Sequence, residues 1–141
     1  MAMKPLDLTK IIPFESPRDP DFGKPEATKF KLCAIPSRVF AHIKDSTTTY
    51  RQKVTEVGES MDVDVNTQSS NRLMTAFGLK GFENYGDLEF KTQKERIGGQ
   101  LFERVHDDIL DAMEPELLGE ISAKVHELNT LSEADEKKSE G

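Results

Sequence analysis

The sequence predicts an α+β fold: a small antiparallel sheet with three to four helices, a C-terminal antiparallel helix pair and an extended proline-rich N-terminal arm. Alternating apolar and polar residues, typical of strands, occur between residues 28 and 65, whereas apolar residues at helical spacing dominate the chain after residue 100. Five of the seven prolines lie within residues 1–27, where they disfavour regular structure. A length of 141 residues fits one domain, which we place at 28–131.

The arm at 1–27 carries few apolar residues, and charged residues separate its prolines. Its apolar patch comprises Ile11, Ile12 and Phe14 together with Pro13. The arm is therefore either mobile or an extended strap laid on a neighbour. We favour the strap, because the patch gives the segment something to bury.

The first strand is predicted at 28–35, TKFKLCAI, because Phe30 and Leu32 share one face while lysines take the other. Pro36 ends this strand, and Ser37 is placed to cap a short helix that reads SRVFAHIKD. The apolar residues of this helix fall at helical spacing, so we expect it to pack on the sheet.

A β-hairpin is predicted next. Residues 47–57 are rich in β-branched side chains, and a glycine-containing separator at 58–60 precedes the alternating run MDVDV at 61–65. A further short strand is predicted at 88–90. Together with the strand at 28–35, these segments complete the expected sheet.

A helix is predicted after the hairpin, with Asn66 or Thr67 as its N-cap and Gly78 or Gly81 at its end. A loop, GFENYGD, is expected after it. The helical segment reads SSNRLMTAFGL, and its apolar side comprises Leu73, Met74 and Phe77.

Two amphipathic helices are predicted in the last third of the chain. The first begins near Gln100 after two glycines, and the second begins at Pro115. Because so short a link joins them, they should form an antiparallel pair. Residues 132–141 contain no large apolar side chain and should form a charged flexible tail. The apolar stripes of the two helices comprise Ile97, Leu101, Val105, Ile109 and Met113, then Leu117, Leu118, Ile121, Val125 and Leu128.

The charge balance disfavours nucleic acid and anionic lipid as partners. With 26 acidic against 19 basic residues the net charge is -7, so phosphate groups would be repelled. The nearest approach to a basic patch consists of Lys91, Lys94 and Arg96, which Glu89 and Glu95 interrupt. No apolar run approaches the roughly 20 residues that a membrane span needs.

Residues with reactive side chains do not combine into a catalytic site. The lone cysteine, Cys33, cannot make an internal disulfide and indicates a reducing, cytoplasmic location. The three histidines, His42, His106 and His126, lack a second ligand at metal-binding spacing. No nucleophile with a positioned base can be assigned. We therefore expect no catalytic residue, no cofactor and no enzymatic activity.

A partial calcium-loop pattern begins at Asp62. Asp62, Asp64 and Asn66 match the opening of such a loop, whose spacing suits a hard cation. The match fails at the sixth position, Thr67, where the loop needs glycine, and at the twelfth, Leu73, where it needs glutamate. On a strand the first three residues would form one polar face, so we expect no metal site.

Three motifs follow one another in the second half of the chain: a helix ending in GLKGFENY, the aspartate-rich ILDAMEPELLGEI, and a closing HELNTLSEADEKKS. From about Asn71 to Ser139 the chain thereby resembles the C-terminal half of a family of small phage proteins, the tail assembly chaperones. Residues 1–27 have no counterpart in this resemblance.

The resemblance implies a phage morphogenesis protein without enzymatic activity. It would coat the long, helical, apolar tape-measure protein until tail-tube subunits polymerise around it. The implied partners are the tape-measure or tail-tube protein and further copies of the chain, and the implied location is the cytoplasm of the infected bacterial host.

Coating a helical protein requires exposed apolar grooves and an acidic surface. The helices predicted at 67–78 and 100–129 are amphipathic enough to supply such a groove, and the alternative is that their apolar stripes form the chain's own core. The residues that we assign to partner binding are Ile11, Ile12, Phe14, Leu73, Phe77, Phe82, Leu101, Val105, Leu118 and Val125.

Two other functions are compatible with the sequence. A virion structural protein, either a head-tail connector or a minor tail component, would lay the proline-rich arm across a neighbouring subunit. A small acidic inhibitor of a host protein would use its charge as a decoy for phosphate, although basic residues accompany the acidic ones along most of the chain. Presence in purified virions would identify the first, and salt-sensitive binding to a basic host protein would identify the second.

Overall fold

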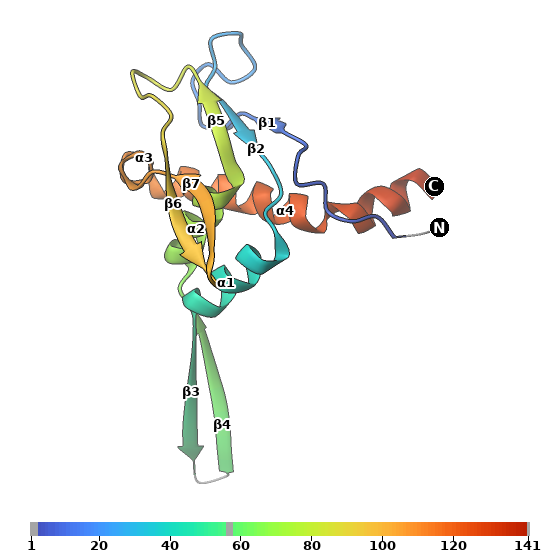
Figure 1. The fold of residues 1–141 in the computed structure, drawn as a ribbon, viewed down its shortest axis with the longest axis vertical. Helices are drawn as coiled ribbons and strands as arrows, with labels where there is room; N and C mark the ends of the chain where they lie inside the picture. Colours follow the sequence, from blue (N-terminus) through green and yellow to red (C-terminus); the bar gives the residue numbers. More distant parts are fainter. Residues whose placement is uncertain (1–2, 56–57, 141) are drawn as a thin grey trace.

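The computed structural model describes residues 3–55 and 58–140, and these have the predicted α+β fold with a small antiparallel sheet and four helices (Figure 1). The described strands form one three-stranded sheet and two separate hairpins. In chain order the elements are β1 (Ile12–Phe14), β2 (Lys29–Leu32), α1 (Ser37–Thr47), β3 (Thr48–Thr55), β4 (Gly58–Val65), α2 (Thr67–Gly78), β5 (Leu79–Glu83), β6 (Thr92–Ile97), β7 (Gln100–Val105), α3 (Asp107–Asp111) and α4 (Pro115–Glu140).

The three-stranded sheet has the order β1-β2-β5, and both outer strands run antiparallel to β2. Its register places Phe14 opposite Phe30 and Phe30 opposite Phe82, so each strand contributes one phenylalanine to a single row. The Phe30 and Phe82 rings meet edge to face with their centroids 6.4 Å apart, an arrangement that aromatic rings favour. The strand predicted at 28–35 is confirmed in a shorter form as β2.

Two strands of this sheet lie where none was predicted. β1 belongs to the proline-rich arm, and its Pro13 is tolerated because an edge strand need not donate every backbone N–H to a neighbour. β5 follows α2 directly and overlaps the first residues of the loop expected at 81–87. Conversely, the prediction of a strand at 88–90 is wrong, because that segment has no regular structure and the next strand is β6.

The helix predicted from Gln100 is also wrong in its first part, which forms strand β7 of a hairpin with β6. The four-residue spacing of Leu101 and Val105 is close to one helical turn, but it is also an even number and fits one face of a strand equally well. Gly98 and Gly99, with φ of 58° and 80°, form the two-residue turn. Such glycine turns match the twist of a hairpin, which favours the strand.

As a consequence, the C-terminal antiparallel helix pair does not form in the described chain. The only helix between β7 and α4 is α3, which spans five residues. α4 packs against α2 instead, where Gly78 lies beside Val125. α4 extends to Glu140, through 132–140, the segment for which a charged tail was predicted.

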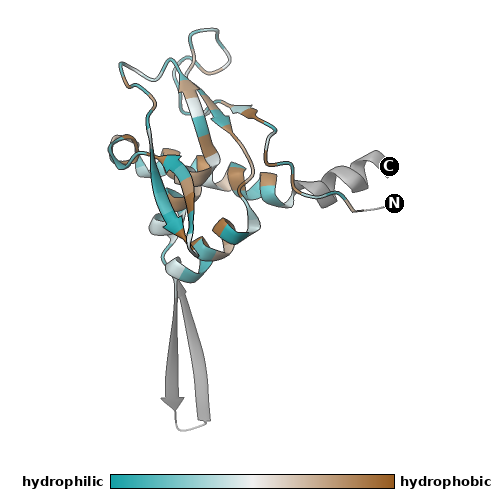
Figure 2. Ribbon diagram, in the orientation of Figure 1, coloured by the Kyte–Doolittle hydropathy of each residue, from teal (hydrophilic) through white to brown (hydrophobic). Residues whose placement is uncertain are grey.

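The hydrophobic core lies where α1, α2, β2, β5, β7 and the first half of α4 meet, and Figure 2 shows hydrophobic residues gathered there. The polar side chain of Asn129 on α4 reaches into this region. It accepts a hydrogen bond from the Ile35 backbone N–H at 3.0 Å and donates one to the Ile35 carbonyl at 2.8 Å. Asn129 thus pairs with the backbone of the segment between β2 and α1, where no described strand does so.

The predicted N-caps differ in outcome. Asn66 caps α2, because its side-chain oxygen accepts a hydrogen bond from the Ser69 backbone N–H at 3.0 Å. Ser37 does not cap α1, because the helix already begins at that residue and its N-cap is Pro36, without a side-chain hydrogen bond. Pro36 was expected to end the preceding strand, but β2 already ends at Leu32, and the proline marks the start of the helix instead.

The predicted hairpin forms as β3 and β4 and projects away from the rest of the chain (Figure 1). The separator predicted at 58–60 is wrong, because these residues are the first three of β4. Its strands pair without a register shift from Thr48 opposite Val65 to Thr55 opposite Gly58. A hydrogen bond from the Asn66 N–H to the Thr47 carbonyl, 2.7 Å long, closes its base.

Candidate partner-binding site

The structure disperses the residues predicted to bind a partner. Ile11 and Leu101 are exposed at 47% and 51%, while Ile12 and Phe14 on β1 are half-buried. Leu73 and Phe82 are partly buried against the core. The remaining four belong to the core itself, and each is at most 8% exposed: Phe77, Val105, Leu118 and Val125. The apolar stripes of the helices therefore form the chain's own core.

A cleft of about 450 Å³ opens between the arm, the sheet and the α3–α4 junction. Its size is suited to the side chains of a peptide. We call it the arm cleft. It is lined by Ser16, Arg18, Asp19, Pro20, Thr28, Phe30, Tyr85, Ala112, Glu114 and Leu117.

Hydrogen bonds to α4 hold the arm wall of this cleft. The buried Ser16 hydroxyl donates to the Glu120 carboxylate, at 2.6 Å from Oε2. Two residues later, Arg18 Nη2 lies 3.0 Å from Glu114 Oε2. Both sides of this second pair are more than half exposed, so the Arg18–Glu114 pair adds little stability. The Ser16 contact is the stronger anchor of the arm.

A local turn fixes the arm on its other side. The Asp19 carboxylate accepts hydrogen bonds from two backbone N–H groups, those of Thr28 at 2.8 Å and Asp21 at 2.9 Å. These bonds tie the start of the loop to the residue that precedes β2. The arm wall is therefore set by backbone contacts and does not depend on apolar packing alone.

Aromatic side chains form the floor of the arm cleft. Phe30, only 1% exposed, meets Tyr85 edge to face with ring centroids 5.3 Å apart. Tyr85 in turn meets Phe82, with ring centroids 5.2 Å apart. Burial raises the pKa of the Tyr85 phenol, and the nearby charge of Glu114 raises it further. The phenol therefore stays neutral and can donate a hydrogen bond to a partner.

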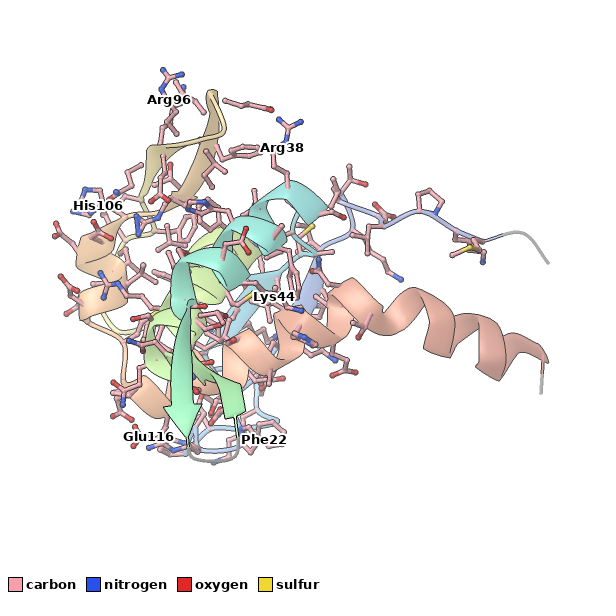
Figure 3. The ribbon with its side chains drawn as sticks, turned by 90° about the horizontal axis from the view of Figure 1, so that it is seen from below. Phe22, Arg38, Lys44, Arg96, His106 and Glu116 are labelled. Carbon is pink, nitrogen blue, oxygen red and sulfur yellow. The ribbon has the colours of Figure 1, made fainter. Side chains whose placement is uncertain are left out.

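The rim of the cleft is acidic overall. Arg18 lies between two glutamates, 3.0 Å from Glu114 and 3.9 Å from Glu116, so its charge is already neutralised. In the view of Figure 3, Glu116 lies at the same edge of the molecule as Phe22, a loop residue that is 53% exposed. An apolar floor with an acidic rim suits an apolar side chain flanked by lysine or arginine.

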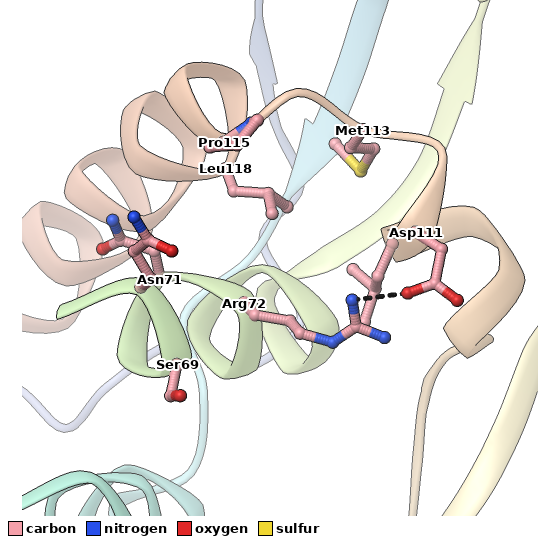
Figure 4. A pocket seen from close by; sticks show the side chains of 9 residues that line it. Ser69, Asn71, Arg72, Asp111, Met113, Pro115 and Leu118 are labelled. Carbon is pink, nitrogen blue, oxygen red and sulfur yellow. Dashed lines mark hydrogen bonds and ion pairs between the residues drawn. The ribbon is translucent and has the colours of Figure 1, made fainter. Parts of the chain in front are cut away.

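A second cleft of about 340 Å³ lies between α2 and the α3–α4 junction (Figure 4). Met113 and Leu118 contribute apolar surface to it, but its α2 wall is polar. The ion pair between Arg72 Nη1 and Asp111 Oδ1, 2.8 Å long, links two of the elements that line it. Because this pair already satisfies its charges, we rank this cleft below the arm cleft.

Asp107 is the centre of a polar cluster between α2, β6 and β7. Its Oδ1 accepts hydrogen bonds from Arg104 at 2.6 Å and from Arg72 at 3.3 Å, and its backbone N–H donates to Gln93 at 2.9 Å. Arg104 is only 5% exposed and also lies 3.6 Å from Glu95. Each charge in this cluster has a partner of opposite sign, which is typical of a structural network.

The other residues considered for chemistry lie apart. Asp62 and Asp64 are on strand β4, whereas Asn66 caps α2. His106 precedes α3, where its Nδ1 accepts a hydrogen bond from the Asp108 N–H, and Lys91 pairs with Asp108 at 3.1 Å. The remaining candidates lie on different elements. His42 is on α1, and Lys94 and Arg96 are on β6. His126 is on α4, where its ring packs near that of Phe40.

Within the part of the chain that the structure describes, no group of three or more histidine, cysteine, aspartate or glutamate residues is arranged to hold a metal ion. No described helix is both long enough and apolar enough to cross a membrane.

Comparisons with protein-family models, with curated proteins and with solved structures gave no match.

Sequence reasoning missed most of the arm cleft. Its walls come from segments far apart in the chain, at 16–20, 28–30, 85 and 112–117. Leu117 was placed in an apolar stripe, but Tyr85 was assigned to a loop and Ser16 to an arm without regular secondary structure. No local pattern marks such residues, because the cleft exists only once the arm docks on α4.

Proposed function

We propose that this chain is a non-enzymatic phage morphogenesis protein, a tail assembly chaperone that holds a helical segment of the tape-measure protein in the arm cleft. It acts in the cytoplasm of the infected bacterial host and is released before the virion is complete. The motifs between Asn71 and Ser139 support this role through their resemblance to the chaperone family.

One observation carries the choice of site. The arm cleft joins an aromatic and aliphatic floor, formed by Phe30, Tyr85 and Leu117, to polar lining residues among which Asp19 and Glu114 are acidic and Arg18 is basic. A partner helix that presents an apolar residue beside lysine or arginine matches both parts. Many weak contacts of this kind along one long helix would give a stable coat.

The test is binding of the full-length chain to overlapping peptides that tile the tape-measure protein of the same phage, measured by fluorescence anisotropy. We expect a subset of apolar peptides with basic flanks to bind, and their affinity to fall with added salt because the rim is acidic. In Leu117→Gln, which makes the floor polar, affinity should fall about tenfold.

Leu101→Gln is the matched control. Leu101 is exposed on β7 and does not line the cleft, so its replacement should leave binding unchanged. Thermal unfolding of both variants checks that they fold. Equal binding by the wild type and Leu117→Gln, with both folded, would rule out the arm cleft, and failure of every tape-measure peptide would rule out the partner.

A second candidate function is a virion structural protein, a head-tail connector or minor tail component. The projecting hairpin of β3 and β4 favours it, because such an arm can reach a neighbouring subunit. Mass spectrometry of purified virions decides between the two. A chaperone should be absent from finished particles, whereas a structural protein should be present at a fixed copy number.

A further inference from the structure

The hairpin of β3 and β4 has two open edges. Among the described strands, β3 and β4 pair only with each other, although each has eight residues. At about 3.3 Å per residue, such an arm is about 26 Å long. Two-stranded hairpins are marginally stable by themselves, and their unpaired edges are templates for a further strand.

The two strands carry opposite charges. In β3 the charged residues are Arg51 and Lys53, both basic, whereas in β4 they are Glu59, Asp62 and Asp64, all acidic. One edge of the arm therefore belongs to a basic strand and the other to an acidic strand.

The register also separates polar from apolar positions. Residues directly opposite one another share a face of a two-stranded ribbon, and each face takes every second pair. The pairs Tyr50 with Val63 and Gln52 with Met61 fall on one face, and the pair Arg51 with Asp62 falls on the other. The first face also takes the pair Val54 with Glu59, and Glu59 is the one charged residue among its pairs, a pattern that favours burial of the rest against another surface.

We propose that this hairpin joins copies of the chain head to tail, with β4 of one copy paired to β3 of the next. Charge complementarity selects this partner, because an acidic strand then lies beside a basic one. Pairing β3 with β3, or β4 with β4, would place like charges side by side, which destabilises a sheet. A symmetric dimer through these edges is therefore disfavoured.

Head-to-tail pairing is a heterologous contact, so it can repeat until it closes into a ring or continues as a filament. Adjacent hairpins then form one antiparallel sheet in which basic and acidic strands alternate. This contact is independent of the arm cleft and needs no tape-measure protein.

The test uses two charge reversals in the full-length chain, Lys53→Glu and Asp64→Lys. The register places Lys53 opposite Ser60 and Asp64 opposite Thr49, so both changes lie outside the Arg51–Asp62 register pair. Sedimentation over a range of concentrations should show association of the wild type, with each variant weakened about tenfold.

Mixing the two variants is the decisive step. The intact β4 of Lys53→Glu and the intact β3 of Asp64→Lys form a wild-type contact, and the two changed strands again carry opposite charges, so an equimolar mixture should associate more tightly than either variant alone. Lys10→Glu and Asp87→Lys make the same charge changes at exposed positions outside the hairpin, and they should associate like the wild type. A wild type that stays monomeric, or a mixture no stronger than its parts, would overturn the proposal.

Discussion

Gly78 on α2 lies directly against Val125 on α4. A Cβ atom added to Gly78 would come within 2.5 Å of Val125 Cγ2 and 2.7 Å of Val125 Cγ1. Val125 is fully buried, so it has no free space into which to move. This pair sets the distance between the two helices that form the centre of the core.

Gly78→Ala should therefore destabilise the fold by about 1 to 3 kcal/mol through overpacking, although alanine is the better helix former. Urea unfolding measures the change. The matched control is Gly119→Ala on α4, where the new Cβ would meet only Asn71 Nδ2 at 3.4 Å. That variant should be neutral or more stable by about 0.5 to 1 kcal/mol. If Gly78→Ala behaves like the control, the helices are less tightly packed than described.

Asn129→Ala should cost about 2 kcal/mol or more. The backbone N–H and carbonyl of the buried Ile35 would both lose their partner, and unsatisfied buried groups are expensive. Thr130→Ala serves as the control, because the Thr130 hydroxyl is exposed and bonds only within its own helix. The control should change stability by less than about 0.5 kcal/mol. Similar values for the two variants would contradict the role given to Asn129.

The Cys33 thiol should react slowly while the chain is folded. It is 1% exposed and donates a hydrogen bond to the Leu8 carbonyl of the arm at 3.0 Å. Burial raises the pKa of this thiol, so the reactive thiolate is scarce. Alkylation by iodoacetamide should therefore follow unfolding. Removing residues 1–10 should speed it, whereas rapid alkylation of the intact chain would show that the arm does not cover the thiol.

The raised pKa of the Cys33 thiol makes the stability of the folded chain depend on pH. The folded state favours the protonated thiol. The contribution of Cys33 to the free energy of unfolding is therefore fully present below the unfolded pKa of about 8.5, and it is lost as pH rises toward the higher folded pKa. Unfolding free energies at about pH 7 and about pH 9 should thus differ less in Cys33→Ala than in the wild type. An equal pH dependence in both would exclude the thiol as its source.

Local sequence patterns predicted secondary structure correctly where the pattern fits only one kind of element. Alternation predicted β2 and the β3–β4 hairpin, and Asn66 was identified as a possible cap of α2. Prediction failed at Leu101 and Val105, because a spacing of four residues suits both a helix and a strand. It also missed β5, because Gly81, which was expected to end the helix or begin a loop, lies within that strand.

The sequence by itself determined the α+β class, the hairpin and the acidic balance of the chain, because periodicity and charge are properties of neighbouring residues. Only the tertiary structure decided that α4 packs on α2, that Asn129 pairs with Ile35, and that the arm docks on α4 to form a cleft. These contacts join residues about a hundred positions apart in the last two cases. Their energies depend on shape and on hydrogen-bond partners that no local pattern contains.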